Sequence, residues 1–424
     1  MNELLPTSMT SDQHLLLALL SSKPGDRSSG QEEIRWDDFL RLVGGLYLAP
    51  FVAYLLQEDS RGFPDSVRDQ ISASGRANTM RQMRRHAALR RIAKSLEEAR
   101  IPLIILKGMA LAYIAYPNPY CRFMADIDLF VPREDLERAA QFVRNCGFRE
   151  SQDVFLMERL RPATEHRESF VLLSSDGSVQ IEIHASLRSL TEFGIDSDSL
   201  WNRSVVADLS GVEVRVLGPE DFMQHLCLHI GPYHHYLSRL QGLLDFRFYL
   251  ERHGKKIDWQ ALSGRSLQNG SSAWVYLTLW LARELVGAPV PGDFFQACPA
   301  PKHLGDLSRL ATHHLLYVSN LPMTSSFVKL CAARSFRDRW DALAEHWGNV
   351  GARASDSHSP REARLFWLRD YLKFALHRLK FYVRAGTFRP SVWSAAAEYH
   401  ASRARLLNLM ESEAQILPPN RPAA

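Results

Sequence analysis

The chain has 424 residues, 46% of them hydrophobic, and a formal net charge of +4. This length is enough for two or three domains with sizeable cores, and such a mild charge does not favour nucleic acid as a partner. The five cysteines lack metal-site spacing, and no signal-peptide pattern or long uncharged apolar run is present, so we expect a cytoplasmic protein with reduced thiols and no transmembrane helix.

The first hundred residues have a helical pattern after a polar loop at 21–32. Apolar residues recur with helical spacing between residues 34 and 99, and 78–96 is predicted as one long helix rich in arginine. A solvated basic face is the interpretation we favour, with docking of an acidic acceptor as the alternative. The arginines concerned are Arg81, Arg84, Arg85, Arg90 and Arg91.

A buried strand followed by a glycine turn is predicted next. The apolar run 101–106 ends in Lys107 and Gly108, and a helical stretch follows at 109–116. A strand, a glycine turn and a helix N-terminus together form a site that suits phosphate, because backbone N–H groups point outwards there. The sequence therefore predicts phosphate binding at this turn.

Two aspartates occupy one face of the next predicted strand, 126–131. Side chains alternate along a strand, so Asp126 and Asp128 project from the same side. Two carboxylates in that arrangement repel each other, and aspartate is depleted in strands. A divalent cation between them is the usual explanation.

A third carboxylate follows on a predicted hairpin. A helix at 133–145 is expected first, then strands at 170–173 and 179–184 joined by an Asp-Gly turn, and a last short strand at 212–216. Glu182 and His184 lie on the polar face of the second hairpin strand. Carboxylates on adjacent strands fit a two-metal site for phosphoryl transfer.

The rest of the chain is expected to be helical after Pro219, with loops at 264–270, 289–292 and 352–360. His225 and His229 are four apart, which suits a zinc site, but polar helix positions packed towards the active site are the interpretation we favour. The aromatic and basic stretch 365–383 is expected to pack within the helical region rather than on a membrane surface.

The predicted fold is therefore α+β, with a small mixed-sheet core between two helical regions. Its expected parts are an N-terminal helical region, the α/β core, a C-terminal helical region and a disordered-like tail, at 1–98, 99–218, 219–417 and 418–424.

These motifs resemble the DNA polymerase beta-type nucleotidyltransferase superfamily. The resemblance rests on Lys107-Gly108, the Asp126-Ile-Asp128 triplet and Glu182 in a later strand. More narrowly, the chain is similar to a poorly characterised bacterial nucleotidyltransferase family over about residues 75 to 250, through the motifs at 105–108, 116–117, 122–131 and 180–184 and a helix with His225, His229 and Asp245.

The resemblance implies that Asp126, Asp128 and Glu182 hold two Mg²⁺ ions and carry the catalysis. The expected nucleotide-binding residues are Lys107, Gly108, Arg122, His184, His229 and Asp245. Arg122 has an alternative as the structural ion-pair partner of Asp126 or Asp128, and His184 as a support for Glu182. The implied reaction moves a nucleoside monophosphate from an NTP, with ATP as the expected donor, to a hydroxyl or phosphate of a small molecule, peptide or protein.

The chain departs from better-known superfamily members at the turn, where they have Gly-Ser or Gly-Gly and this chain has Lys107-Gly108-Met109. Lys107 can supply charge that the serine would not. Two other classes remain as alternatives: a non-catalytic nucleotide-binding or interaction module on the same fold, and a nucleic-acid polymerase. The complete set of acids counts against the first, and the mild net charge counts against the second.

Overall fold

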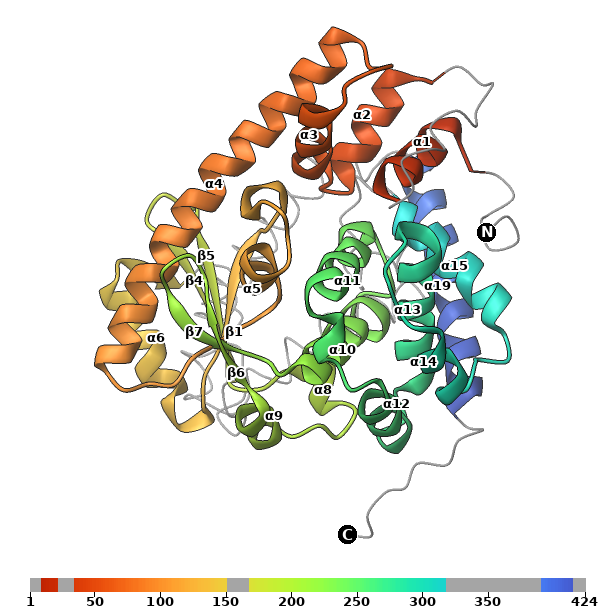
Figure 1. Cartoon of the computed structure of the whole chain (residues 1–424). Helices are drawn as coiled ribbons and strands as arrows, with labels where there is room; N and C mark the ends of the chain where they lie inside the picture. The colour runs from red at the N-terminus through yellow and green to blue at the C-terminus, as the bar shows by residue number, and fades with distance from the viewer. Residues whose placement is uncertain (1–8, 22–33, 151–167, 318–389, 415–424) are drawn as a thin grey trace, which may run out of the picture.

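The computed structural model describes residues 9–21, 34–150, 168–317 and 390–414. It is an α+β fold, as predicted: a seven-stranded mixed sheet lies between N-terminal helices and a larger group of C-terminal helices (Figure 1). Four helices come first, and the longest of them passes along the sheet. They are α1 (Ser11–Leu20), α2 (Trp36–Gly45), α3 (Ala49–Glu58) and α4 (Asp65–Glu98).

The sheet has the strand order β3-β4-β5-β2-β1-β7-β6. Strand β2 pairs in parallel with β5 and antiparallel with β1, which itself pairs in parallel with β7. The strands are β1 (Ile104–Ile105), β2 (Asp126–Phe130), β3 (Phe148–Glu150), β4 (Ser169–Ser174), β5 (Gln180–His184), β6 (Val205–Asp208) and β7 (Glu213–Val216). The site strands β2 and β5 therefore lie inside the sheet, with neighbours on both sides.

Shorter helices connect these strands, and two of them lie between β1 and β2 in the chain. The connecting elements are α5 (Lys107–Ile114), the 3₁₀ helices η1 (Pro119–Cys121) and η2 (Arg133–Asp135), α6 (Leu136–Asn145), α8 (Arg188–Thr191) and α9 (Ser197–Arg203). Gly147 after α6 has a φ of +88°, a left-handed conformation that suits glycine.

The C-terminal region is helical, as predicted. Its elements are α10 (Pro219–Leu228), the π-helical turn η3 (His229–Tyr233), α11 (Leu240–His253), η4 (Gly254–Lys256), α12 (Trp259–Gln268), α13 (Ser272–Val286), α14 (Gly292–Ala297), α15 (Leu304–Leu316) and α19 (Pro390–Ala414). None of the helices in the described part of the chain is long and apolar enough to cross a membrane.

One hydrophobic cluster joins all three regions. It includes Leu16 of α1, Leu89 of α4, Ile127 of β2 and Leu277 of α13, each with no exposed surface. The N-terminal helices, the sheet and the C-terminal helices therefore share a core, and they hold the site between them.

Three local predictions need correction. The expected loop at 264–270 is mostly helix: α12 continues to Gln268 and includes Gly264, which has no other atom crowding it. Strand 101–106 is reduced to two residues, and the strands β3 and β6 were not predicted. The expectations for 21–32, 352–360, 365–383 and the tail concern residues that fall largely or wholly outside the described part of the chain.

Candidate active site

The parallel register of β2 and β5 brings the acidic residues together. Asp128 lies opposite Glu182, and Asp126 lies opposite Gln180. Ile127 and Leu129 on the other face of β2 have no exposed surface, so burial of that face fixes which way the aspartates point. The predicted pairing of the two carboxylate strands is therefore present in the sheet.

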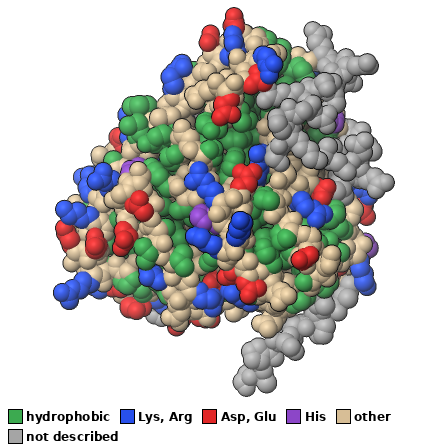
Figure 2. Space-filling model, in the orientation of Figure 1, with side chains coloured by type: hydrophobic (Ala, Val, Ile, Leu, Met, Phe, Trp, Pro, Cys, Tyr) green, Lys and Arg blue, Asp and Glu red, His purple; other side chains and the backbone are tan. Residues whose placement is uncertain are grey.

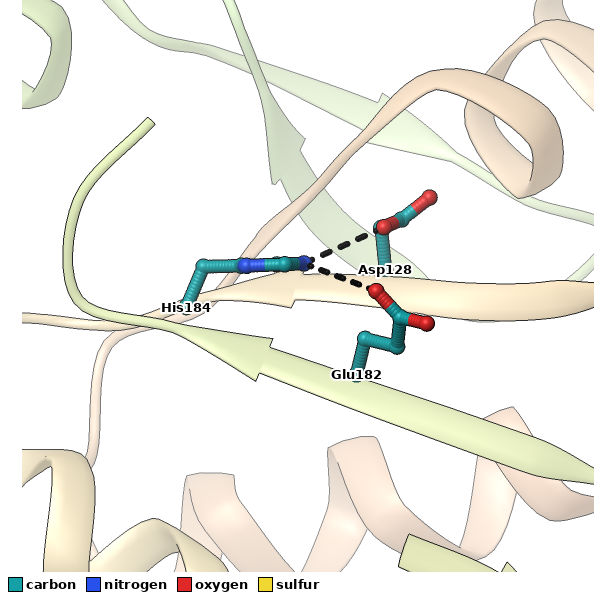
Figure 3. Close-up of side chains that lie close together, drawn as sticks. All are labelled: Asp128, Glu182 and His184. Carbon is teal, nitrogen blue, oxygen red and sulfur yellow. Dashed lines mark hydrogen bonds and ion pairs between the residues drawn. The ribbon is translucent and has the colours of Figure 1, made fainter. Parts of the chain in front are cut away.

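Asp128, Glu182 and His184 form a compact cluster (Figure 3). Their ligand atoms lie within 4.8 Å of one another, the single such metal-capable group in the described residues. His184 Nε2 is 3.1 Å from Asp128 Oδ1 and 3.6 Å from Glu182 Oε2. The amide of Gln180 donates to Glu182 Oε1 at 2.7 Å. Asp126 shares the face of β2 but lies outside this group.

Lys107 supplies a positive charge beside the cluster. Its Nζ lies 3.3 Å from Asp128 Oδ1 and 3.0 Å from Nε2 of His229. The backbone of Lys107 has a φ of +30°, a left-handed conformation that is strained for a lysine, at the turn between β1 and α5. The turn thus aims the ammonium group at the carboxylates.

The two aspartates experience opposite electrostatic effects. Burial raises the pKa of Asp126 to about 6, and repulsion from Asp128 and Glu182 adds to this, while Lys107 partly offsets it. Burial alone would also raise the pKa of Asp128, but Lys107 and the hydrogen bond from His184 outweigh burial and hold that pKa well below its usual value. Asp128 therefore ionises at a lower pH than Asp126 does.

Gly108 lies in the first turn of α5, where no side chain caps the helix N-terminus. A Cβ added at Gly108 would lie 2.9 Å from Nη1 of Arg122 and 3.1 Å from Cγ of Met124. Glycine is therefore required by the close approach of these side chains. The exposed backbone N–H groups of such a helix start are suited to bind an anion.

Arg122 and Asp245, both predicted to bind nucleotide, bind each other. The guanidinium donates two hydrogen bonds to the Asp245 carboxylate, at 2.8 and 2.7 Å, and the hydroxyl of Tyr116 donates a third at 2.7 Å. The ion-pair partner of Arg122 is thus Asp245 rather than Asp126 or Asp128. All three side chains are buried, so the cluster joins α11 firmly to the segment before β2.

A row of polar side chains on α4, not predicted from the sequence, faces the segment before β2. Amide groups of Asn78 donate to the carbonyls of Tyr120 and Arg122, and Gln82 also donates to that of Arg122. Arg85 donates to the carbonyl of Ala125 at 2.9 Å. The prediction of a solvated face is therefore wrong for Arg85, which is buried, while the four other arginines are exposed. Positions 78, 82 and 85 are three or four residues apart, so they lie on one face of the helix. This spacing was the signal in the sequence that could have indicated a shared polar contact.

The histidines near the site are packed against one another. The rings of His225 and His229 have centroids 5.9 Å apart, and those of His229 and His234 are 4.4 Å apart. Burial lowers the pKa of each below its ordinary value, and the charge of Lys107 contributes. Among the described residues, the one metal-capable group does not include them.

Comparison with known proteins adds one finding. A family model described as "uncharacterised nucleotidyltransferase" matches residues 32–287, more than half of the 424 residues. The matched segment begins before α2 and ends with α13, so it includes the helices on both sides of the sheet. A search of curated proteins gave no match.

Proposed function

The chain belongs to the uncharacterised nucleotidyltransferase family, and from that premise we propose that it moves a nucleoside monophosphate from an NTP to an acceptor. ATP is the expected donor, and the acceptor is a hydroxyl or phosphate of a small molecule, a peptide or a protein. An acceptor oxygen attacks the α-phosphorus, the bond from that phosphorus to the β-bridging oxygen breaks, and pyrophosphate leaves. The reaction is expected to take place in the cytoplasm.

The observation that carries the proposal is the opposition of Asp128 and Glu182 on adjacent parallel strands. Their carboxylate oxygens, with those of Asp126, are the ligands that Mg²⁺ prefers, and we propose that the three hold two Mg²⁺ ions. Such ions neutralise phosphate charge and make an acceptor hydroxyl more acidic. His184 offers nitrogen, which suits Mg²⁺ less well, so we assign it the task of orienting Asp128 and Glu182 by hydrogen bonding.

The triphosphate is proposed to lie at the start of α5. The first turn of this helix has no side-chain cap, so its N–H groups can donate to the phosphate oxygens, and Lys107 adds a positive charge. His229 holds the ammonium of Lys107 through a 3.0 Å contact. Arg122 and Asp245 contribute by fixing the backbone between η1 and β2, because their charges are already paired.

Asp126 is the carboxylate that we propose as proton acceptor from an acceptor hydroxyl. It is less buried than Asp128 and lies outside the compact group of Asp128, Glu182 and His184, so its carboxylate is the one of the two aspartates that an acceptor can approach more easily. The proton would then move to one carboxylate oxygen of Asp126 as the new phosphoester bond forms. With a phosphate acceptor, which is already ionised, this role of Asp126 is not needed.

The test is nucleotide binding measured by thermal shift. Each of the four NTPs is added with and without Mg²⁺ to the wild type and to Asp126→Asn/Asp128→Asn, with Asp293→Asn in exposed α14 as the matched control. We expect Mg²⁺-dependent stabilisation by at least one NTP in the wild type and the control, lost in the double variant. Stabilisation that survives in the double variant, or none with any NTP, contradicts the proposal; the second result favours a non-catalytic module.

A further inference from the structure

An exposed aromatic side chain stands in the turn between α2 and α3. Tyr47 keeps 50% of its surface exposed, among the highest values for large hydrophobic residues in the described part of the chain. Its φ of +60° is left-handed, a conformation that is an outlier for a bulky residue. Backbone strain of this kind persists where the surrounding structure holds it, and it commonly accompanies a binding role.

Tyr47 stacks on a second aromatic ring. The centroids of Tyr47 and Phe123 are 4.6 Å apart and their planes differ by 15°. Gln241 of α11 holds the backbone of Phe123: its side-chain carbonyl accepts from the Phe123 N–H at 3.1 Å, and its side-chain amide donates to the Phe123 carbonyl at 3.0 Å. Phe123 covers one face of the Tyr47 ring, and half of the surface of Tyr47 stays exposed, so Tyr47 has surface that a further planar group can contact.

This pair lies beside the candidate active site. Phe123 is three residues before Asp126, and its chain neighbours Arg122 and Met124 are the residues that pack against Gly108. Arg239 is near enough to Asp126 and to Tyr47 for both to raise its pKa, although burial has the larger, opposite effect. The aromatic pair is therefore a neighbour of the proposed phosphate turn and of the carboxylates.

We propose that Tyr47 and Phe123 form a stacking platform for the nucleobase of the donor nucleotide, so that the N-terminal helical region supplies part of the nucleotide site. This inference rests on the proposed function. Figure 2 shows hydrophobic side chains that extend from the N-terminal helices towards a group of Lys, Arg and His side chains at the middle of the face. A nucleoside triphosphate matches that combination, because it joins a planar apolar ring to a polyanion.

The polar side of the site favours the same placement. His229 contacts both Lys107 and His234 on the side of the cluster towards η3, where the Lys107 ammonium supplies positive charge. That side suits the phosphate oxygens of the nucleotide. The nucleobase is then expected to contact the aromatic pair. Stacking on an aromatic side chain tolerates any base, so the platform is expected to add affinity for all four NTPs.

The experiment compares each Mg²⁺–NTP with Mg²⁺–tripolyphosphate, which has the phosphates but no base, by isothermal titration calorimetry. The variants are Tyr47→Leu, which keeps an apolar side chain but removes the ring, and Tyr47→Phe, which keeps the ring. We expect the wild type and Tyr47→Phe to bind NTP about tenfold more tightly than tripolyphosphate. In Tyr47→Leu that gain should disappear while tripolyphosphate binding stays unchanged.

The outcomes separate the platform from the proposed function. A wild type that binds tripolyphosphate and NTP equally, or a Tyr47→Leu variant that keeps the full gain, overturns the platform and leaves the phosphate and metal site intact. A wild type that binds neither ligand overturns the proposed function and the platform with it. Unfolding midpoints of the variants without ligand confirm that each is folded.

Discussion

The carboxylate of Asp245 accepts two hydrogen bonds from the guanidinium of Arg122, and both side chains are buried. The pair connects α11 of the C-terminal region with the segment that leads into β2, 123 residues earlier in the chain. The segment before the site strand is therefore held by a contact between distant parts of the sequence.

We predict that Asp245→Ala destabilises the protein by about 3–5 kcal/mol, because it leaves the Arg122 charge buried without its partner. The matched control is Asp306→Ala, which breaks the exposed pair with Arg309 and should cost about 1 kcal/mol or less. Urea unfolding at neutral pH measures both. Equal losses in the two variants would show that burial does not govern the Arg122 pair.

Asp126→Asn should stabilise the protein at pH 7 in the absence of divalent ions. The folded pKa of about 6 lies above the ordinary value of 3.8, so Asp126 favours folding below about pH 4 and loses this contribution as the pH rises through 6. Removal of the charge should therefore add about 1–3 kcal/mol at pH 7. Unfolding curves between pH 4 and 8 in EDTA test this, and a wild type and variant with parallel pH profiles would refute it.

Asn78→Ala should destabilise the protein by about 1–3 kcal/mol, because the Tyr120 carbonyl loses its 2.7 Å amide donor. The same variant should weaken nucleotide binding, since the loosened segment carries Asp126. Arg84→Ala, an exposed position on the same helix, is the control and should stay within about 0.5 kcal/mol of the wild type. Thermal unfolding and calorimetric titration give the two readouts; a control that loses as much as Asn78→Ala would contradict the role of the amide.

Gly108→Ala should cost about 1–3 kcal/mol, because the new Cβ would lie within 3.2 Å of Arg122 and Met124 atoms. Gly44 in α2 has nothing within 4 Å of an added Cβ, so Gly44→Ala should instead stabilise by about 0.5–1 kcal/mol. Denaturant unfolding of the two variants checks the opposite signs. If Gly108→Ala left the stability unchanged, the turn would have space for a Cβ and the prediction would be wrong.

Local patterns predicted the parts of the site that depend on local geometry. The alternation around Asp126 and Asp128 and the Asp-Gly turn before Glu182 indicate strands and a hairpin, and both are present. The two carboxylate strands were expected to be adjacent, but the parallel direction of their pairing was not predicted. The sheet supplied the register, with Asp128 opposite Glu182.

Contacts between residues that lie far apart in the chain could not be predicted from the sequence. No local pattern pairs Arg122 with Asp245, joins Lys107 to His229, or places Asn78 against the Tyr120 carbonyl. The strand β6 was not predicted either. Val205 and Val206 are exposed, and only pairing with β7 makes that segment a strand. In each case tertiary packing decides what a short window of sequence leaves open.

Helix α4 has 34 residues, which corresponds to about 50 Å of length. The side-chain amides of Asn78 and Gln82 on this helix bind the segment before β2. We therefore expect the helix and the sheet to be inherited together. A recombination that joined a foreign helical region to this sheet at residue 98 would leave the carbonyls of Tyr120 and Arg122 without their donors. Lineages that exchange this core are therefore expected to carry α4 along with it.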